Sequence, residues 1–165
     1  MPATYEPIAT TTVSGSSTTS VTFSSISSAY TDIIVIFNGG GTNPSNIQMQ
    51  LNSDTGTNYS TTSMYGTGTT ATSARYTNLN LMYSAGVAAA LPTTLSAMGI
   101  MSIMNYSNTT TNKTILSRYS NASAETTTNV SLWRNTAAIH TIRLFSYSQA
   151  FLDGSTFTLY GIKAA

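Results

Sequence analysis

The chain is 165 residues long. It has 6 Lys and Arg residues and 5 Asp and Glu residues, which gives a net charge of +1. The six cations are scattered, so no basic cluster could neutralise a run of phosphates, and this argues against nucleic acid as a partner. The absence of cysteine excludes a disulfide framework and thiolate chemistry.

The N-terminal residues lack the basic and apolar regions of a signal peptide, and no apolar run approaches the ~18 residues of a membrane-spanning helix. We therefore expect a soluble protein that is made without a signal peptide and does not enter a membrane. A chain of this length can bury roughly 70% of its unfolded surface, which predicts one domain over residues 1–165.

Hydroxyl side chains dominate the composition. Ser and Thr supply about a third of the chain, whereas charged residues supply 7% against a typical ~25%. Hydrophobic residues still reach 41%, too many for a disordered polar tract. The surface must therefore consist of hydroxyls and amides. Because Thr and Tyr favour pleated strands, the composition predicts an all-β protein.

The first extended segment covers residues 5–13, and Pro7 marks it as an edge strand. Residues 1–13 could also serve as a docking arm. Residues 32–37 form a continuous, mostly β-branched run, which is typical of a central strand buried on both faces.

Alternating segments continue along the chain. In residues 46–51, the apolar side chains at every second position are expected to point inward. Residues 74–83 read as one strand. Polar loops are expected at residues 66–73 and 121–128.

Residues 98–106 and 113–119 predict a central hairpin. The first segment carries apolar side chains on both faces, as in a strand that is covered on both sides. The polar residues 107–112 form the turn between the two strands. In the next strand, Val130 and Leu132 are expected to point inward, with Ser131 and Trp133 opposite. An aspartate in place of Leu116 or Leu132 should then abolish folding, because an unpaired buried charge costs several kcal/mol.

About nine or ten short strands separated by turns, without a convincing helix, are typical of a sandwich or jelly roll. The predicted fold is therefore a single-domain antiparallel β-sandwich that is jelly-roll-like.

No arrangement of residues predicts an enzyme. The only histidine, His140, lies beside Ile139 on an expected strand, where a structural role is the simpler reading. The five acids are spread over different segments, and no two have the spacing of metal ligands or of a glycosidase pair. We expect no catalytic residue, no cofactor and no metal.

Four aromatic residues are the candidate contacts for a partner or a glycan: Tyr59, Tyr65, Tyr76 and Trp133. Aromatic rings on a polar surface can stack on sugars or anchor a protein partner. Packing on the sheet face and contact between subunits are the alternative reading, and we favour it.

Three segments together carry a resemblance: Met-Pro-Ala-Thr-Tyr-Glu-Pro-Ile-Ala at residues 1–9, Met-Asn-Tyr-Ser-Asn-Thr-Thr at residues 104–110, and Gly-Ser-Thr-Phe-Thr-Leu-Tyr-Gly-Ile-Lys at residues 154–163. The chain resembles small virion structural proteins and fibre-tip domains of tailed bacteriophages, particularly those of cyanobacterial and other aquatic hosts. The resemblance implies a β-sandwich or jelly roll located in the virion, commonly a homotrimer, and a role as capsid cement or as a receptor-binding tip.

Two virion roles remain open. A capsid decoration protein would bind the major capsid protein and stabilise the head shell. The tip of a tail or head fibre would instead recognise host surface polysaccharide. The first strand is expected almost at the start of the chain, which leaves little room for the anchoring segment of a fibre, so decoration is the favoured expectation.

Overall fold

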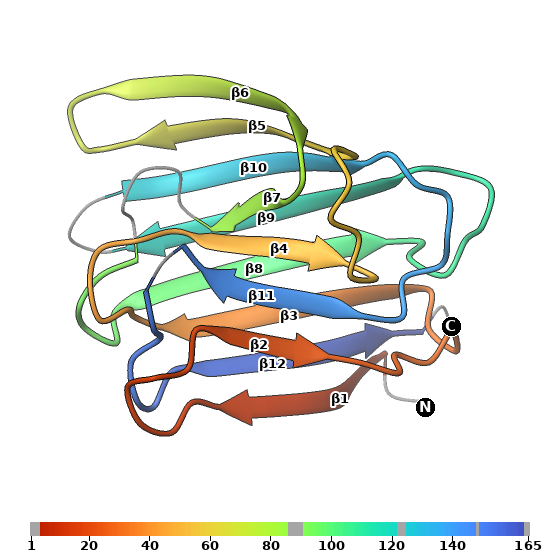
Figure 1. The fold of residues 1–165 in the computed structure, drawn as a ribbon, viewed down its shortest axis with the longest axis horizontal. Helices are drawn as coiled ribbons and strands as arrows, with labels where there is room; N and C mark the ends of the chain where they lie inside the picture. Colours follow the sequence, from red (N-terminus) through yellow and green to blue (C-terminus); the bar gives the residue numbers. More distant parts are fainter. Residues whose placement is uncertain (1–3, 86–90, 122–124, 148, 164–165) are drawn as a thin grey trace.

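The computed structural model describes residues 4–85, 91–121, 125–147 and 149–163. Within these residues the chain forms twelve strands in two antiparallel sheets that pack as a sandwich (Figure 1). The strands are β1 (Tyr5–Thr12), β2 (Ser20–Phe23), β3 (Asp32–Gly39), β4 (Ile47–Leu51), β5 (Tyr59–Gly66), β6 (Ala71–Leu79), β7 (Met82–Ala85), β8 (Ala97–Met104), β9 (Lys113–Asn121), β10 (Glu125–Trp133), β11 (Ile142–Ser146) and β12 (Thr156–Ile162).

The strand order is that of a jelly roll extended by two hairpins. The larger sheet has the order β1-β12-β3-β8-β9-β10-β5-β6, and the smaller sheet has the order β2-β11-β4-β7. Without the hairpins β5–β6 and β9–β10, two four-stranded sheets remain, and successive strands cross between them as in a jelly roll. The hairpins lengthen one sheet alone. The all-β antiparallel sandwich is thus confirmed, with twelve strands rather than nine or ten.

The core lies between the sheets and contains a cluster of three phenylalanine rings. The Phe157 ring lies 4.9 Å from Phe37 and 4.8 Å from Phe151, measured between ring centroids. All three side chains are fully buried. Rings in tilted contact add to the stabilisation that burial of their apolar surface provides.

β4 confirms its local prediction in full, and β3 confirms its own in part. β3, expected to be central and buried on both faces, lies between β12 and β8, but on its outer side Ile36 is only half-buried and Asn38 is exposed, so burial on both faces is wrong. Ile33 and Val35 of β3 are fully buried, and so are Ile47, Met49 and Leu51 of β4. The inward positions expected for residues 46–51 are therefore correct.

The central hairpin forms, but only one of its faces is covered. β8 pairs with β9, and Ile103 lies opposite Ile115. Ile103 and Ile115 point into the sandwich and are buried, whereas Met98 and Leu116 point to the other side and are exposed. The expectation that residues 98–106 are covered on both sides is wrong.

The inward and outward positions predicted for β10 are also reversed. Ser131 and Trp133 are buried in the sandwich, whereas Val130 is exposed and Leu132 is half-buried on the opposite face. Because side chains alternate along a strand, an error of one residue moves the whole set to the other face. Leu116 and Leu132 therefore lie at solvent-facing positions, and an aspartate at either should be tolerated by the fold.

Two expected loops consist partly of strand. β5 and β6 are joined by residues 67–70 alone, so half of the loop expected at residues 66–73 belongs to the two strands. β10 begins inside the loop expected at residues 121–128, of which residues 122–124 lie outside the described part of the chain. The single strand expected at residues 74–83 is divided between β6 and β7, which belong to different sheets.

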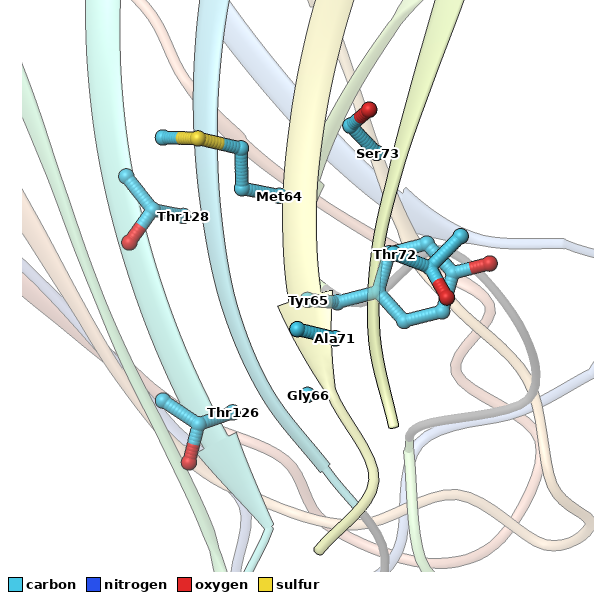
Figure 2. Close-up of a pocket in the computed structure, with 8 residues that line it drawn as sticks. All are labelled: Met64, Tyr65, Gly66, Ala71, Thr72, Ser73, Thr126 and Thr128. Atoms are coloured by element: carbon cyan, nitrogen blue, oxygen red, sulfur yellow. The ribbon is translucent and has the colours of Figure 1, made fainter. Parts of the chain in front are cut away.

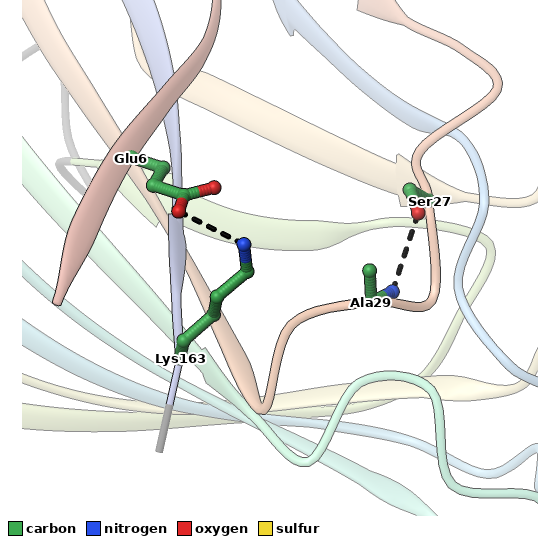
Figure 3. A network of polar contacts seen from close by, with 4 residues as sticks. All are labelled: Glu6, Ser27, Ala29 and Lys163. Carbon is green, nitrogen blue, oxygen red and sulfur yellow. Dashed lines mark hydrogen bonds and ion pairs between the residues drawn. The ribbon is translucent and has the colours of Figure 1, made fainter. Parts of the chain in front are cut away.

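β1 lies at one edge of the larger sheet, where Pro7 cannot donate to a further strand. The pairing of β1 with β12 shifts register between Pro7 and Ala9. Beside this edge, Lys163 Nζ donates to Glu6 Oε1 at 2.9 Å, which lowers the pKa of the Glu6 carboxyl (Figure 3). In the same view, the Ala29 N–H donates to Ser27 Oγ at 3.3 Å and closes a turn.

Candidate functional site

The solvent-facing side of the larger sheet carries a cluster of apolar side chains. We call this surface the outer face and define it by Met64, Met98, Ile100, Met104, Leu116, Arg118, Val130 and Leu132. Five of the eight exposed large hydrophobic residues in the described chain belong to it: Met98 (59% exposed), Met64 (58%), Met104 (58%), Val130 (46%) and Leu116 (37%). Single exposed apolar residues are ordinary, but a cluster on one face indicates an interaction surface.

Strand register makes this cluster continuous. Leu116 of β9 lies directly opposite Val130 of β10, and Ile36 of β3 lies opposite Ile100 of β8. Next to them, Ile100 pairs with Arg118, which places one cation within the apolar set. Directly opposed side chains lie close enough to touch, so the cluster spans neighbouring strands.

Two hollows open on the outer face. The larger, of about 510 Å³, lies where β5, β6 and β10 meet, and Met64, Ser73, Thr126 and Thr128 are among the residues that line it. Figure 2 shows Met64, Thr126 and Thr128 on one side of the hairpin and the Tyr65 ring beside Thr72. The second, of about 350 Å³, is bordered by Ile36, Met98, Ile100, Arg118, Tyr119 and Thr126 among others. Arg118 is the only charged residue that lines either hollow.

The inner side of the hairpins β5–β6 and β9–β10 carries several buried polar side chains among its apolar and aromatic ones. Thr61 Oγ1 and Ser131 Oγ lie 2.8 Å apart, and both bond to the backbone of Tyr83 in β7, Thr61 as acceptor and Ser131 as donor. Hydroxyl groups thus join β7 of the smaller sheet to β5 and β10. Because these buried groups are paired, polar residues can occupy the inside here while apolar residues remain outside.

Asn129 and Ser63 are exceptions on this inner side. Both are buried, and neither the Asn129 amide nor Ser63 Oγ has a hydrogen-bond partner in the described structure. Asn129→Val is therefore expected to raise the free energy of unfolding by about 1–3 kcal/mol, since it removes unpaired buried groups. Urea denaturation followed by circular dichroism measures the change. Ser131→Val removes paired groups and should lower the free energy; an equal loss for Asn129→Val would contradict the assignment.

Two of the four predicted aromatic contacts are in the core. Tyr59 and Trp133 are fully buried, and their rings stack with centroids 6.3 Å apart. Trp133 Nε1 donates to Asp54 Oδ2 at 2.7 Å, and Asn58 Nδ2 donates to the same oxygen at 2.9 Å. In this structure neither ring can reach a glycan or a partner, so the prediction of surface contact is wrong for Tyr59 and Trp133.

Burial and hydrogen bonding have opposite effects on the pKa of the Asp54 carboxyl beside these rings. Burial alone would raise the pKa of the Asp54 carboxyl, but the bonds from Trp133, Asn58 and the Gly56 N–H outweigh it and lower that pKa. Burial raises the pKa of Tyr59 to about 12. The arrangement keeps Asp54 ionised as an acceptor and Tyr59 neutral, which is a structural role.

The other two predicted residues come together beside a third tyrosine. Tyr65 and Tyr76 are half-buried on the inner side of the β5–β6 hairpin. The ring of Tyr76 lies 4.8 Å from that of Tyr83 in β7, between centroids. Burial raises the pKa of Tyr76, and the neighbouring Tyr83 and Tyr65 add to this effect. Glycan or partner contact by Tyr65 and Tyr76 stays a prediction.

No cluster of three or more His, Cys, Asp or Glu residues that could hold a metal occurs in the described ranges. The exposed His140 has its Nδ1 3.2 Å from Thr141 Oγ1, and its backbone N–H donates to Asn52 Oδ1 at 2.9 Å. In the same ranges, no helix is long and apolar enough to cross a membrane.

Neither the protein-family models nor the curated proteins contain a match to this chain. The geometry of the chain is therefore the basis for a functional assignment. Sequence reasoning missed the outer face because it placed every alternating apolar set inside. One signal was available: Trp133, the largest ring, shares its side of β10 with Ser131 and not with Leu132.

Proposed function

We propose that this protein is a non-enzymatic structural component of a virion, and that it decorates the head shell by docking through the outer face. The observation that supports this most is the clustering of exposed apolar side chains on one side of the larger sheet. The resemblance of residues 1–9, 104–110 and 154–163 to small phage structural proteins supplies the virion context.

The chemistry of the outer face suits a protein partner. Met64, Met98 and Met104 present flexible, polarisable side chains, which adapt to the contours of a partner surface. Depletion of charge with retention of arginine is typical of the centre of a protein interface, and Arg118 is placed in that way. A continuous sheet face also offers backbone that does not have to be ordered on binding, which lowers the entropy that docking costs.

Co-sedimentation tests this assignment. Purified protein is mixed with expanded phage heads that lack it and, separately, with whole host cells. Saturable binding to heads alone is expected for a decoration protein. Binding to cells alone, competed by surface polysaccharide, would contradict it.

A matched pair of variants tests the surface itself. Leu116→Lys is expected to weaken binding to heads by at least about tenfold, because it places a charge in the centre of the apolar cluster. Leu95→Lys is the control: Leu95 is also exposed but is not part of the outer face. Equal binding by wild type and Leu116→Lys, measured by sedimentation at several concentrations, would exclude the outer face as the docking surface.

The second candidate function is recognition of host surface polysaccharide. It is favoured by the group of half-buried tyrosines Tyr65, Tyr76 and Tyr83, because aromatic rings stack on sugars. Under this function, Tyr76→Ala should remove binding to cells and leave binding to heads unchanged. The two candidates therefore differ in the target that is bound and in the variant that removes this binding.

A further inference from the structure

The two edges of the larger sheet are protected unequally. At β1, Pro7 lacks a backbone donor, the register shifts between Pro7 and Ala9, and the Glu6–Lys163 ion pair lies beside the edge. Such features prevent the addition of another strand. β6, at the opposite edge, contains neither proline nor lysine, and Arg75 is its only charged residue.

β6 also has the regular geometry that strand addition requires. Ala71–Tyr76 pair with β5 residue by residue, and the register shift is confined to the end of β6, where Asn78 has a positive φ of 55°. Most β6 side chains are exposed. In Figure 1, β6 forms the upper boundary of the molecule, with its free side turned away from the other strands. A nine-residue edge of this kind is a template for pairing.

We propose that β6 pairs antiparallel with β6 of a second copy of this chain, around a twofold axis that passes beside Ala74. In this register Ala74 faces its own counterpart, Ser73 faces Arg75 of the second copy, and Thr72 faces Tyr76. All residues from Ala71 to Thr77 then find an opposite residue within β6.

Charge and pairing preferences select this register over its neighbours. A twofold axis at Arg75 would place two cations opposite each other, which is destabilising. An axis at Ser73 would pair Tyr76 with Thr70, which lies outside β6. The axis at Ala74 avoids both and sets an aromatic ring against a β-branched side chain, a favourable cross-strand pair. Because the net charge of the chain is only +1, two copies repel each other little at long range.

The pairing has a consequence for the outer face. A twofold axis perpendicular to the sheet keeps each face on its own side, so the two eight-stranded sheets would form one continuous sheet. In each copy, the hollow that Met64 and Ser73 line lies beside β6, so the two equivalent hollows of the dimer would lie close to the axis. This inference concerns assembly of the chain in solution, does not depend on the proposed role in a virion, and gives a dimer where the resemblance implies a homotrimer.

Size-exclusion chromatography with light scattering over a range of micromolar concentrations tests the pairing. The expected mass at the upper concentrations is twice the chain mass of 17.4 kDa. Ser73→Lys is expected to raise the dissociation constant about tenfold, because it opposes Arg75 twice in the dimer, and Ser73→Glu is expected to lower it by a similar factor. Ser73 is exposed, so circular dichroism should show both variants folded.

Ser120→Lys and Ser120→Glu are matched controls. They introduce the same charges as the Ser73 variants, but Ser120 lies on β9, away from the β6 edge. They should leave the dissociation constant unchanged. A wild-type chain that stays monomeric at every concentration overturns the inference. A mass of three chains, or a dimer that responds equally to the Ser73 and Ser120 variants, also overturns it.

Discussion

Replacing Trp133 with alanine is expected to lower the free energy of unfolding by about 3–5 kcal/mol. The indole is fully buried and stacks on Tyr59 with an interplanar angle of 15°. The substitution removes this contact and leaves a cavity between the sheets. It also removes the Nε1–H that donates to Asp54 at 2.7 Å, so a charged acceptor loses a partner. Urea denaturation monitored by far-ultraviolet circular dichroism measures the loss.

Two controls separate the causes of this loss. Leu132→Ala changes the neighbouring residue on the outer face, where the side chain is only half-buried, and should cost about 1 kcal/mol or less. Trp133→Phe keeps an aromatic ring in place but removes the bond to Asp54, so it should cost about 1.5–3 kcal/mol. Equal losses for Trp133→Ala and Leu132→Ala would contradict the orientation of β10 in this structure.

Strongly alkaline solution is expected to unfold this protein through its buried tyrosines. The pKa of Tyr59 is raised from 10.0 to about 12 by burial, and burial raises the pKa of Tyr119 as well. Between these values the unfolded chain releases the Tyr59 proton while the folded chain retains it. Stability is therefore lost as pH rises from 10 to 12, by about 3 kcal/mol from Tyr59 alone.

Lys113 has the opposite pH dependence, and the measurement must allow for it. Its Nζ donates to the carbonyl oxygens of Thr111 and Thr136 at 2.8 and 3.0 Å, and burial lowers its pKa below 10.5. The unfolded chain then holds the lysine proton to higher pH than the folded chain, so this residue adds stability as pH approaches 10.5. Above 10.5 the loss from the tyrosines should dominate.

Urea midpoints measured at several pH values from 10.5 upward test this expectation, together with the tyrosinate absorbance of the native protein. Tyr59→Phe serves as the control, because it removes the ionisable hydroxyl and keeps the ring. It should flatten the decline of stability with pH, although it starts from a lower value after losing the bonds to Leu51 and Asp54. A decline as steep as that of the wild type would show that Tyr59 does not cause it.

Local chemistry was enough to predict most of the segments that form strands. The β-branched run at residues 32–37 became β3, and the turn residues 107–112 connect β8 to β9. Low charge with abundant Thr and Tyr predicted an all-β sandwich, because such side chains suit pleated surfaces and little else. The inward residues of β4 were also predicted correctly, since their apolar set faces the core.

The sequence alone could not decide which side of β9 and β10 lies inside. Alternation has two equivalent phases within an isolated strand, and in β10 hydrophobicity favoured the set that contains Val130 and Leu132. The structure buries the other set because β7 of the smaller sheet covers that side. There it bonds to Thr61 and Ser131, while Trp133 on the same side bonds to Asp54.

The candidate sites were likewise predictable from the sequence only in part. The presence of aromatic and apolar residues was visible in the sequence, but their accessibility was not. Tyr76 and Tyr83 meet only because β6 and β7, consecutive in the chain, enter different sheets. The local pattern of this protein determined its strands, whereas the packing of one sheet on another determined which residues can meet a partner. Burial is a property of what lies opposite a residue, and for β9 and β10 this is β7 of the smaller sheet, which is distant along the chain.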